Sequence, residues 1–275
     1  MELQGLVDWL DEFGRPAHLF DLTDQVALVT GAAGGIGRWL AAGLASAGAT
    51  IMLSDADPDG LELVAKALAG AGGKCGTYVA DLADEATTEA LVTRTVKAYD
   101  HLDVLVNCAA TNCRTPALDV APKEYDEIMA VNLRAPYFLS RAAARHMIGH
   151  GGSIVHVGSI NSAQGLAGVS VYGAAKAGLA QLTRVQAIEW APHGIRVNCL
   201  APGFIRTSLS EPLWRDPARS EWILSRVPLR RPGEPHELVG LLLLLTSHAG
   251  SFITGQTLYA DGGFLAGSHW PENSW

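Results

Sequence analysis

Cysteine is scarce in this sequence, and its cysteines follow no metal-binding or disulfide pattern. The 275 residues include four, Cys75, Cys108, Cys113 and Cys199, and no two of them form a C-x-x-C pair. The histidines show no spacing typical of metal ligands either. We therefore expect a reduced, cytoplasmic protein that has no disulfide framework and binds no metal.

Long apolar runs and an excess of positive charge are also missing. The longest apolar run, 241–245, is far shorter than the ~20 residues of a membrane-spanning helix. Residues 1–4 contain no basic segment and no apolar core typical of a signal peptide. The formal net charge is −8, which argues against nucleic acid or an anionic membrane as the main partner.

Apolar strand-like runs alternate with helix-like segments along most of the chain. Strands are predicted at 26–29, 50–54, 75–80, 104–107, 153–158, 195–200 and 256–260, and helices at 38–47, 58–70, 84–99, 121–150 (interrupted near Asn132 and Pro136), 171–191 and 234–247. This alternation predicts an α/β fold, a doubly wound, Rossmann-like parallel sheet of about seven strands with helices on both faces.

The chain has no evident linker or internal repeat, so we expect one domain at 25–265. Residues 1–24 form an N-terminal extension with roughly helical apolar spacing, and we expect a short amphipathic helix there. Residues 266–275 form a tail whose two tryptophans, Trp270 and Trp275, predict that it packs on the body or on a neighbouring subunit. Residues 203–232 show little regular period.

Residues 25–37 contain the motif around which the rest of the chain is organised. A short apolar strand leads into a glycine-rich turn, 31–37, and then into an Ala/Leu-rich helix. This arrangement holds a pyrophosphate, because glycines let backbone N–H groups approach the phosphates at a helix N-terminus. The spacing Thr30-Gly31-x3-Gly35-x-Gly37 does not match G-x-G-x-x-G, so an ordinary glycine-rich turn is the alternative.

Asp55 ends the second predicted strand and indicates the type of nucleotide. An acid about 20 residues after the glycine turn accepts hydrogen bonds from the adenosine ribose in dinucleotide folds. A carboxylate there would repel a 2′-phosphate, and we expect no basic residue nearby to hold a phosphate, so we predict NAD(H) rather than NADP(H). The alternative is that Asp55 is only a turn residue.

Asp81-Leu82 and Asn107–Ala110 also end strands, and each can be read as a cofactor contact or as a plain turn.

The strongest signal is the pair Tyr172 and Lys176. Four residues apart at a helix start, they lie on one face, where an ammonium favours the tyrosinate and lowers the tyrosine pKa from its usual value of about 10. Tyr172 is then usable as a general acid/base. Ser159, 13 residues upstream at a strand end, is placed to hydrogen-bond the same substrate oxygen. The alternative is a surface Tyr/Lys pair.

These motifs resemble, in order and spacing, those of the short-chain dehydrogenase/reductase family over about residues 22–265. They are Thr30-Gly31-x3-Gly35-x-Gly37, Asn107-Cys-Ala-Ala, Asn132, Ser159, Tyr172-x3-Lys176 and Pro202-Gly203. The resemblance implies an NAD-dependent oxidoreductase that interconverts a secondary alcohol and a ketone. It also implies a homotetramer with interfaces at 121–148 and 171–190.

The resemblance also implies a role for each matching position. Tyr172 transfers the proton, Ser159 orients the carbonyl, Lys176 binds the nicotinamide ribose, and Asn132 holds a proton-relay water. Implied cofactor contacts are Gly31, Gly35, Ile36, Gly37, Asp55, Asp81, Leu82, Asn107, Ala109, Tyr172, Lys176, Pro202, Gly203, Ile205 and Thr207. Two positions depart from the family pattern: Ala110 and Asp24 stand where glycine is usual.

The expected substrate walls are 111–118, 160–168 and 203–232. They contain Arg114, Arg206, Trp214, Arg215, Arg219 and Trp222. Guanidinium groups suit carboxylates or phosphates, and aromatic faces suit sugar rings or other apolar bodies. The alternative for the arginines is a solvated lid surface. The segment 19–23 and the Arg114 loop look like those of family members that act on sugar acids, such as gluconate 5-dehydrogenases. We therefore predict a sugar, polyol or sugar-acid substrate contacting Arg114, Ser159 and Tyr172. The alternatives are a reductase of 3-oxoacyl thioesters or other ketones, and a non-catalytic NAD-binding regulator.

Overall fold

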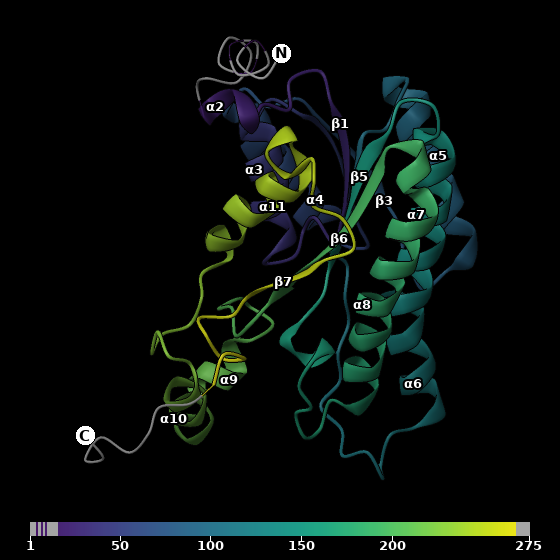
Figure 1. Cartoon of the computed structure of the whole chain (residues 1–275). Coiled ribbons are helices and arrows are strands. Elements are labelled where there is room, and N and C mark those ends of the chain that lie inside the picture. The colour runs from purple at the N-terminus through teal and green to yellow at the C-terminus, as the bar shows by residue number, and fades with distance from the viewer. Residues whose placement is uncertain (1–3, 5–6, 8, 10–15, 268–275) are drawn as a thin grey trace.

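The computed structural model describes residues 16–267 together with Gln4, Val7 and Trp9. In this part of the chain, seven parallel strands form one sheet in the order β3-β2-β1-β4-β5-β6-β7 (Figure 1). The strands are β1 Val26–Thr30, β2 Thr50–Asp55, β3 Cys75–Val79, β4 Val104–Asn107, β5 Gly152–Val157, β6 Ile195–Pro202 and β7 Thr257–Ala260. The predicted fold class is confirmed. The predicted tail packing, and most of the predicted N-terminal helix, lie outside the described residues.

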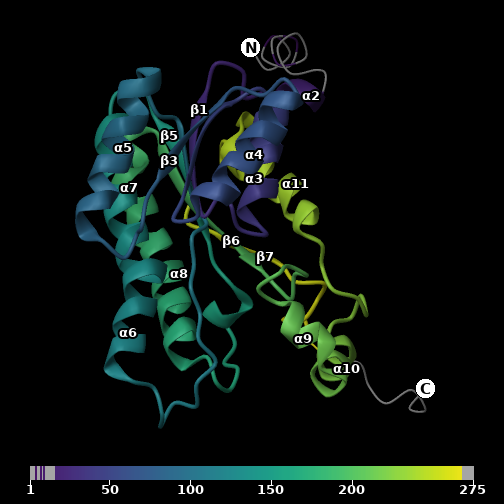
Figure 2. The same cartoon turned by 180° about the vertical axis from the view of Figure 1, so that it is seen from behind.

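Helices cover both faces of the sheet (Figures 1 and 2). Those in contact with one face are α3 Gly37–Ser46, α4 Pro58–Gly70 and α11 Val239–Thr246; those on the other are α5 Glu85–Tyr99, α7 Ala135–Met147 and α8 Ser170–Trp190. The remaining helices are α2 Pro16–Leu19, α6 Pro122–Met129, α9 Glu211–Arg215 and α10 Pro217–Arg226. Within the described residues, no helix combines the length and the apolarity needed to cross a membrane.

The strands are apolar throughout because both faces of the sheet are buried. Along β1, Ala27 and Val29 belong to the core beneath α3 and α4, whereas Val26 and Leu28 belong to the core beneath α5 and α7. All five residues of β1 are buried. This double burial fixes the register of the sheet and therefore the height at which each strand ends.

The strand order reverses between β1 and β4, and this reversal places the cleft. Open α/β sheets bind ligands at such a point, outside the carboxyl ends of the strands. The Thr30 hydroxyl accepts hydrogen bonds from the amides of Cys108 (3.1 Å) and Ala109 (3.3 Å). Gly31 has φ +66°, and a Cβ there would lie 2.7 Å from the Ala109 backbone. Only glycine therefore lets the two strand ends approach so closely.

The region after β6 is more regular than the sequence suggests. Residues 203–232, where we expected little regular structure, contain α9 and α10, which lie together beyond the carboxyl end of β6 (Figure 2). The side chain of Asp216 accepts hydrogen bonds from the amides of Ala218 and Arg219, and Pro217 occupies the first turn of α10. An acidic N-cap followed by proline is a helix-start signal, but the short helices give too few turns for a visible period.

Candidate active site

A cavity of about 1550 Å³ opens at the carboxyl ends of the strands. Its walls come from the glycine turn, the loops after β2 to β6, and the start of α8. The predicted site residues that line it are Gly31, Gly35, Ile36, Gly37, Asp55, Asp81, Leu82, Ala109, Arg114, Ser159, Tyr172, Lys176, Pro202, Gly203, Ile205 and Thr207. Asn107 and Asn132 do not line it and lie behind its wall.

The glycine turn is built from close backbone contacts. A Cβ on Gly37 would lie 2.0 Å from the Gly31 carbonyl oxygen, and a Cβ on Gly35 would lie 2.7 Å from the Thr207 side chain. The turn is therefore tight, and the loop after β6 packs directly on it. The N-terminus of α3 faces the cavity through Ile36 and Gly37. Accessible backbone at a helix N-terminus fits the pyrophosphate of a dinucleotide.

One end of the cavity places a carboxylate and a guanidinium beside the same residue. The carboxylate of Asp55 accepts hydrogen bonds from the amides of Ala33 (3.0 Å) and Asp57 (3.1 Å). Arg38 also lines the cavity, and its guanidinium donates to the carbonyl oxygens of Ala33 and Gly34. The expectation that no basic residue lies near Asp55 is therefore wrong. Helix side chains point back toward the N-terminus, which carries Arg38 of the first turn over the preceding loop.

The catalytic candidates meet in the middle of the cavity. Tyr172 and Lys176 lie one turn apart near the start of α8, and Ser159 follows the end of β5. Ser159 and Tyr172 line the same part of the cavity, and the Ser159 hydroxyl is close enough to the phenol to lower its pKa. Lys176 is buried, its Nζ donates to the Val157 carbonyl oxygen (2.8 Å), and this Nζ lies 5.5 Å from the centroid of the Tyr172 ring. The pair is therefore not a surface Tyr/Lys pair.

The pKa of Tyr172 differs from our expectation. Burial raises it to about 12; the hydrogen bond with Ser159 lowers it only in part, and the nearby Cys108 raises it further. Burial lowers the pKa of Lys176 to about 8. The expected lowering of the tyrosine pKa by Lys176 is wrong for the protein alone, because desolvation of the phenol dominates and the ammonium lies over the ring.

Asn132 lies in a π-helical segment, η1 Ala130–Arg134, between α6 and α7. Its side-chain amide donates to the carbonyl oxygens of Thr111 (2.7 Å) and Ile128 (2.9 Å), while Oδ1 has no hydrogen-bond partner among the described residues. Pro136, four residues later, has no N–H, so the Asn132 carbonyl loses its α-helical donor. The predicted interruption near Asn132 and Pro136 is thus present, and π segments are frequent at functional sites.

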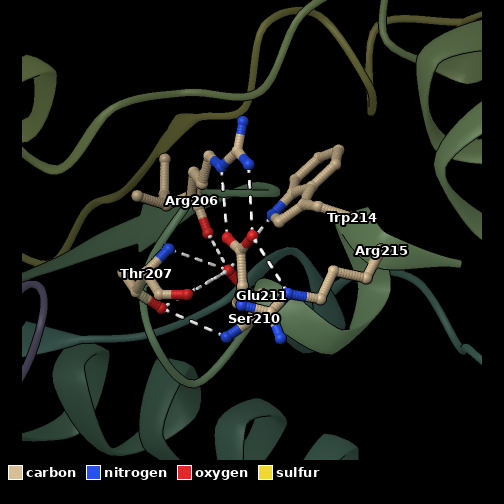
Figure 3. Close-up of polar contacts among 7 residues, drawn as sticks. Arg206, Thr207, Ser210, Glu211, Trp214 and Arg215 are labelled. Atoms are coloured by element: carbon tan, nitrogen blue, oxygen red, sulfur yellow. Dashed lines mark hydrogen bonds and ion pairs between the residues drawn. The ribbon is translucent and has the colours of Figure 1, made fainter.

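The substrate end of the cavity uses only some of the predicted side chains. Figure 3 shows Glu211 between Arg206 and Arg215, with N–O distances of 3.2 and 3.6 Å. Trp214 donates its indole N–H to the Ser210 hydroxyl (3.2 Å). The predicted side chains of Arg206, Trp214 and Arg215 do not line the cavity. Those of Arg114, Arg219 and Trp222 do. The sequence could not reveal which of these side chains line the cavity, because that depends on how α9 and α10 pack against the rest of the fold.

Comparison with known proteins agrees with this geometry. The sequence profile of a family described as enoyl-(acyl carrier protein) reductase matches residues 31–265. The chain is 39% identical to the 2-dehydro-3-deoxy-D-gluconate 5-dehydrogenase of Escherichia coli K12, over 90% of this chain and 98% of that protein. The chain belongs to the short-chain dehydrogenase/reductase family. The family predicted from the motifs is confirmed.

Two further relatives of this dehydrogenase/reductase are informative. The gluconate 5-dehydrogenase of Gluconobacter oxydans 621H is 37% identical over 89% of this chain and 96% of its own length. A crystal structure of a gluconate 5-dehydrogenase from Burkholderia cenocepacia J2315, in complex with NADP and tartrate, is 34% identical over 92% of this chain and 99% of that one, with a TM-score of 0.88.

The buried ammonium of this dehydrogenase/reductase predicts a pH-dependent stability. Lys176 has a folded-state pKa of about 8 and an ordinary value of 10.5, so between these values the unfolded chain binds a proton that the folded chain does not. Stability therefore rises with pH in this window, by about 1 kcal/mol per pH unit. Above pH 9 the Cys108 thiol, whose pKa burial raises to about 12, acts in the opposite direction.

Urea denaturation between pH 7 and 9 measures this effect. The free energy of unfolding of the wild type, minus that of Lys176→Met, should grow between pH 8 and 9. A difference that stays constant across this range would show that Lys176 is not buried as an ammonium.

Proposed function

We propose that the chain is an NAD(H)-dependent oxidoreductase that interconverts a secondary alcohol and a ketone on a sugar, polyol or sugar acid. The single observation that carries the proposal is the meeting of Ser159, Tyr172 and the buried Lys176 inside the cavity that begins at the glycine turn. The names of the relatives support sugar acids as the substrate class.

The side chains act on one oxygen atom of the substrate. A bound nicotinamide supplies or accepts the hydride. In reduction, Tyr172 donates its proton to the carbonyl oxygen, since burial keeps its pKa at about 12 and the phenol protonated at neutral pH. The Ser159 hydroxyl orients the same oxygen, and Lys176 stabilises the negative charge that develops on the phenol. Asn132, through its unpartnered Oδ1, holds the relay water.

Tyr172→Phe tests the proposal. The variant keeps the ring against Lys176 but has no transferable proton, so turnover should fall by about 10³-fold or more while NAD(H) binding stays within about threefold. The wild type is first screened with NAD across aldonic acids, neutral sugars, polyols and apolar alcohols. Isothermal titration calorimetry measures cofactor affinity. Wild-type activity on acyl thioesters or steroids alone would contradict the substrate class, and an unchanged rate in Tyr172→Phe would contradict the mechanism.

Two other functions make different demands on these residues. A reductase of 3-oxoacyl thioesters or other ketones would use the same Ser159, Tyr172 and Lys176, and the family profile carries an acyl-reductase description. The arginines at the substrate end favour a small acid instead. A non-catalytic regulator would have no use for a buried ammonium, because an unneeded buried charge is costly.

The choice between NAD(H) and NADP(H) depends on the charges of Asp55 and Arg38. We assign NAD(H) as the preferred cofactor because the Asp55 carboxylate is fixed by two backbone amides at the end of β2, where it would accept from ribose hydroxyls and repel a 2′-phosphate. Arg38 is the competing influence, since a guanidinium attracts a phosphate. The Burkholderia cenocepacia relative binds NADP, which is the cofactor that the Arg38 guanidinium would favour.

Neutralising Asp55 and Arg38 one at a time distinguishes the effects of their two charges on cofactor preference. In Asp55→Asn, the ratio of kcat/KM for NADP to that for NAD should rise by about tenfold or more, because the repulsion of the 2′-phosphate is removed. In Arg38→Ala, the same ratio should fall. Steady-state kinetics with both cofactors measures the ratio. An Asp55→Asn ratio equal to that of the wild type would contradict the assignment.

Arg114 is our candidate for the substrate carboxylate. It lines the cavity and has no hydrogen bond or ion pair with any other described residue, whereas Arg219 pairs with Asp216 at 3.2 Å. An unpaired guanidinium is free to bind a carboxylate in a bidentate manner.

Arg114→Gln should raise KM for aldonic acids by about tenfold or more, since one charge-assisted hydrogen bond is worth about 1.5–3 kcal/mol. The kcat/KM for neutral polyols should stay unchanged. Arg215→Gln is the matched control, because Arg215 pairs with Glu211 away from the cavity. Equal losses on acids and polyols would assign Arg114 to the structure of its loop instead of to the substrate.

We also propose a cytoplasmic homotetramer that assembles through α6 to α8. An apolar hollow on this face is lined by Leu133, Phe138, Leu182 and Val185, and Ile188 beside it is 77% exposed. A monomer rarely leaves such a surface in water. The thiols are all free, which suits a reducing compartment.

A further inference from the structure

Behind the catalytic residues, a chain of four buried polar side chains links the strands β4 and β5 to the helices α7 and α8 on one face of the sheet. The Asn107 side-chain amide, at the end of β4, donates to the Ser140 hydroxyl of α7 (3.0 Å) and lies 3.1 Å from Nδ1 of His156 in β5. Nε2 of His156 lies 3.0 Å from Oε1 of Gln186 in α8. All four side chains are at most 2% exposed.

The partners of His156 fix its protonation. The Asn107 amide nitrogen can only donate, so Nδ1 accepts; the Gln186 oxygen can only accept, so Nε2 carries the proton. The imidazole is therefore neutral, with one tautomer. Burial lowers the pKa of His156 to about 4, and the nearby Lys176 lowers it as well. A proton on Nδ1 would also be directed at the N–H group of Asn107.

This chain joins the elements that carry the catalytic candidates. His156 precedes Val157, whose carbonyl accepts the Lys176 hydrogen bond, and stands three residues before Ser159. Gln186 is on the same helix as Tyr172 and Lys176. Asn107 is the register partner of His156 across β4 and β5, and Asn107 is followed by Cys108 and Ala109 in the cavity wall.

We propose that His156 is a positioning residue of the active site, which through Asn107 and Gln186 holds the end of β5 and the helix α8 at the spacing that Ser159, Tyr172 and Lys176 need. The inference rests on the proposed roles of these three residues. An apolar side chain at position 156 would fill the core equally well but would not fix this spacing, because hydrogen bonds have a length and a direction whereas apolar packing has neither.

Two substitutions of His156 test the inference. In His156→Leu, kcat should fall by about 10- to 100-fold, because small displacements of catalytic groups are costly, while KM for the cofactor changes by less than about threefold. His156→Gln retains one donor and one acceptor and should recover most of the rate. Ile154→Ala is the matched control: Ile154 lies two residues earlier in β5 and faces the same side of the sheet, but its side chain is apolar. This control should lose stability but keep kcat.

Gln186→Leu supplies a second route, useful if His156→Leu does not fold. It should reproduce the fall in kcat. Where His156→Leu folds, the double variant of His156→Leu and Gln186→Leu should lose no more than His156→Leu alone, since both act through one hydrogen-bonded chain. Additive losses would overturn the inference.

A readout that does not need the substrate is the pKa of the Tyr172 phenol. It is measured as the ultraviolet difference spectrum between each protein and its Tyr172→Phe partner during titration from pH 8 to 12.5. We expect a shift in His156→Leu and none in Ile154→Ala. An unchanged phenol pKa with an unchanged kcat in His156→Leu would refute the positioning role. Wild-type inactivity on every alcohol and ketone, together with the expected shift, would refute the proposed function and leave the positioning role standing.

Discussion

The cleft depends on one buried ammonium group. Lys176 is 2% exposed, and a buried charge is tolerated only where polar groups compensate for lost water. Its fixed partner is the Val157 carbonyl oxygen at the end of β5, and its other neighbour is the ring of Tyr172 on its own helix. β5 and α8 therefore cannot shift against each other without exposing or stranding a charge. The compensation is partial, as the pKa of about 8 indicates.

The same constraint bears on three buried polar residues near Lys176. Most of the sheet is covered by aliphatic side chains on both faces. Asn107, Asn132 and His156 are among the polar side chains that are buried, and each of the three lies on an element that carries or borders the Ser159–Tyr172–Lys176 group. Buried hydrogen-bonded groups specify geometry more narrowly than apolar contacts do.

The sequence predicted the sheet, its helices and most of the cavity wall, because these follow from local patterns. Period-two and period-3.6 apolar spacing sets the elements, and strand ends in a parallel sheet meet at one edge. Side-chain partners over long sequence separations were not predictable. Asn107 ends a strand, as expected of a cofactor contact, yet its side chain turns away from the cavity toward Ser140 and His156.

Arg38 and Glu211 illustrate two other limits of sequence reasoning. Arg38 could have been found from the direction of side chains in a first helical turn, which brings it back over Gly34. Glu211 could not, since its neutralisation of Arg206 and Arg215 needs the fold of the segment after β6. The raised pKa of Tyr172 also needs coordinates, because desolvation depends on what surrounds the phenol and not on its spacing from Lys176.

The nucleotide end of the cleft sets a competition between two fixed charges. Asp55 is held by the amide of Ala33, and Arg38 by the carbonyl of the same residue, so a carboxylate and a guanidinium flank one peptide segment of the glycine turn. Because the backbone anchors both groups, neither can rotate away without losing its hydrogen bonds. Asp55 lies at the end of β2 and is only half-exposed, whereas Arg38 is exposed to water, which screens its charge more strongly. In the proposed NAD(H) assignment the less screened charge is the stronger influence, so that a ribose hydroxyl would be favoured over a phosphate at this position.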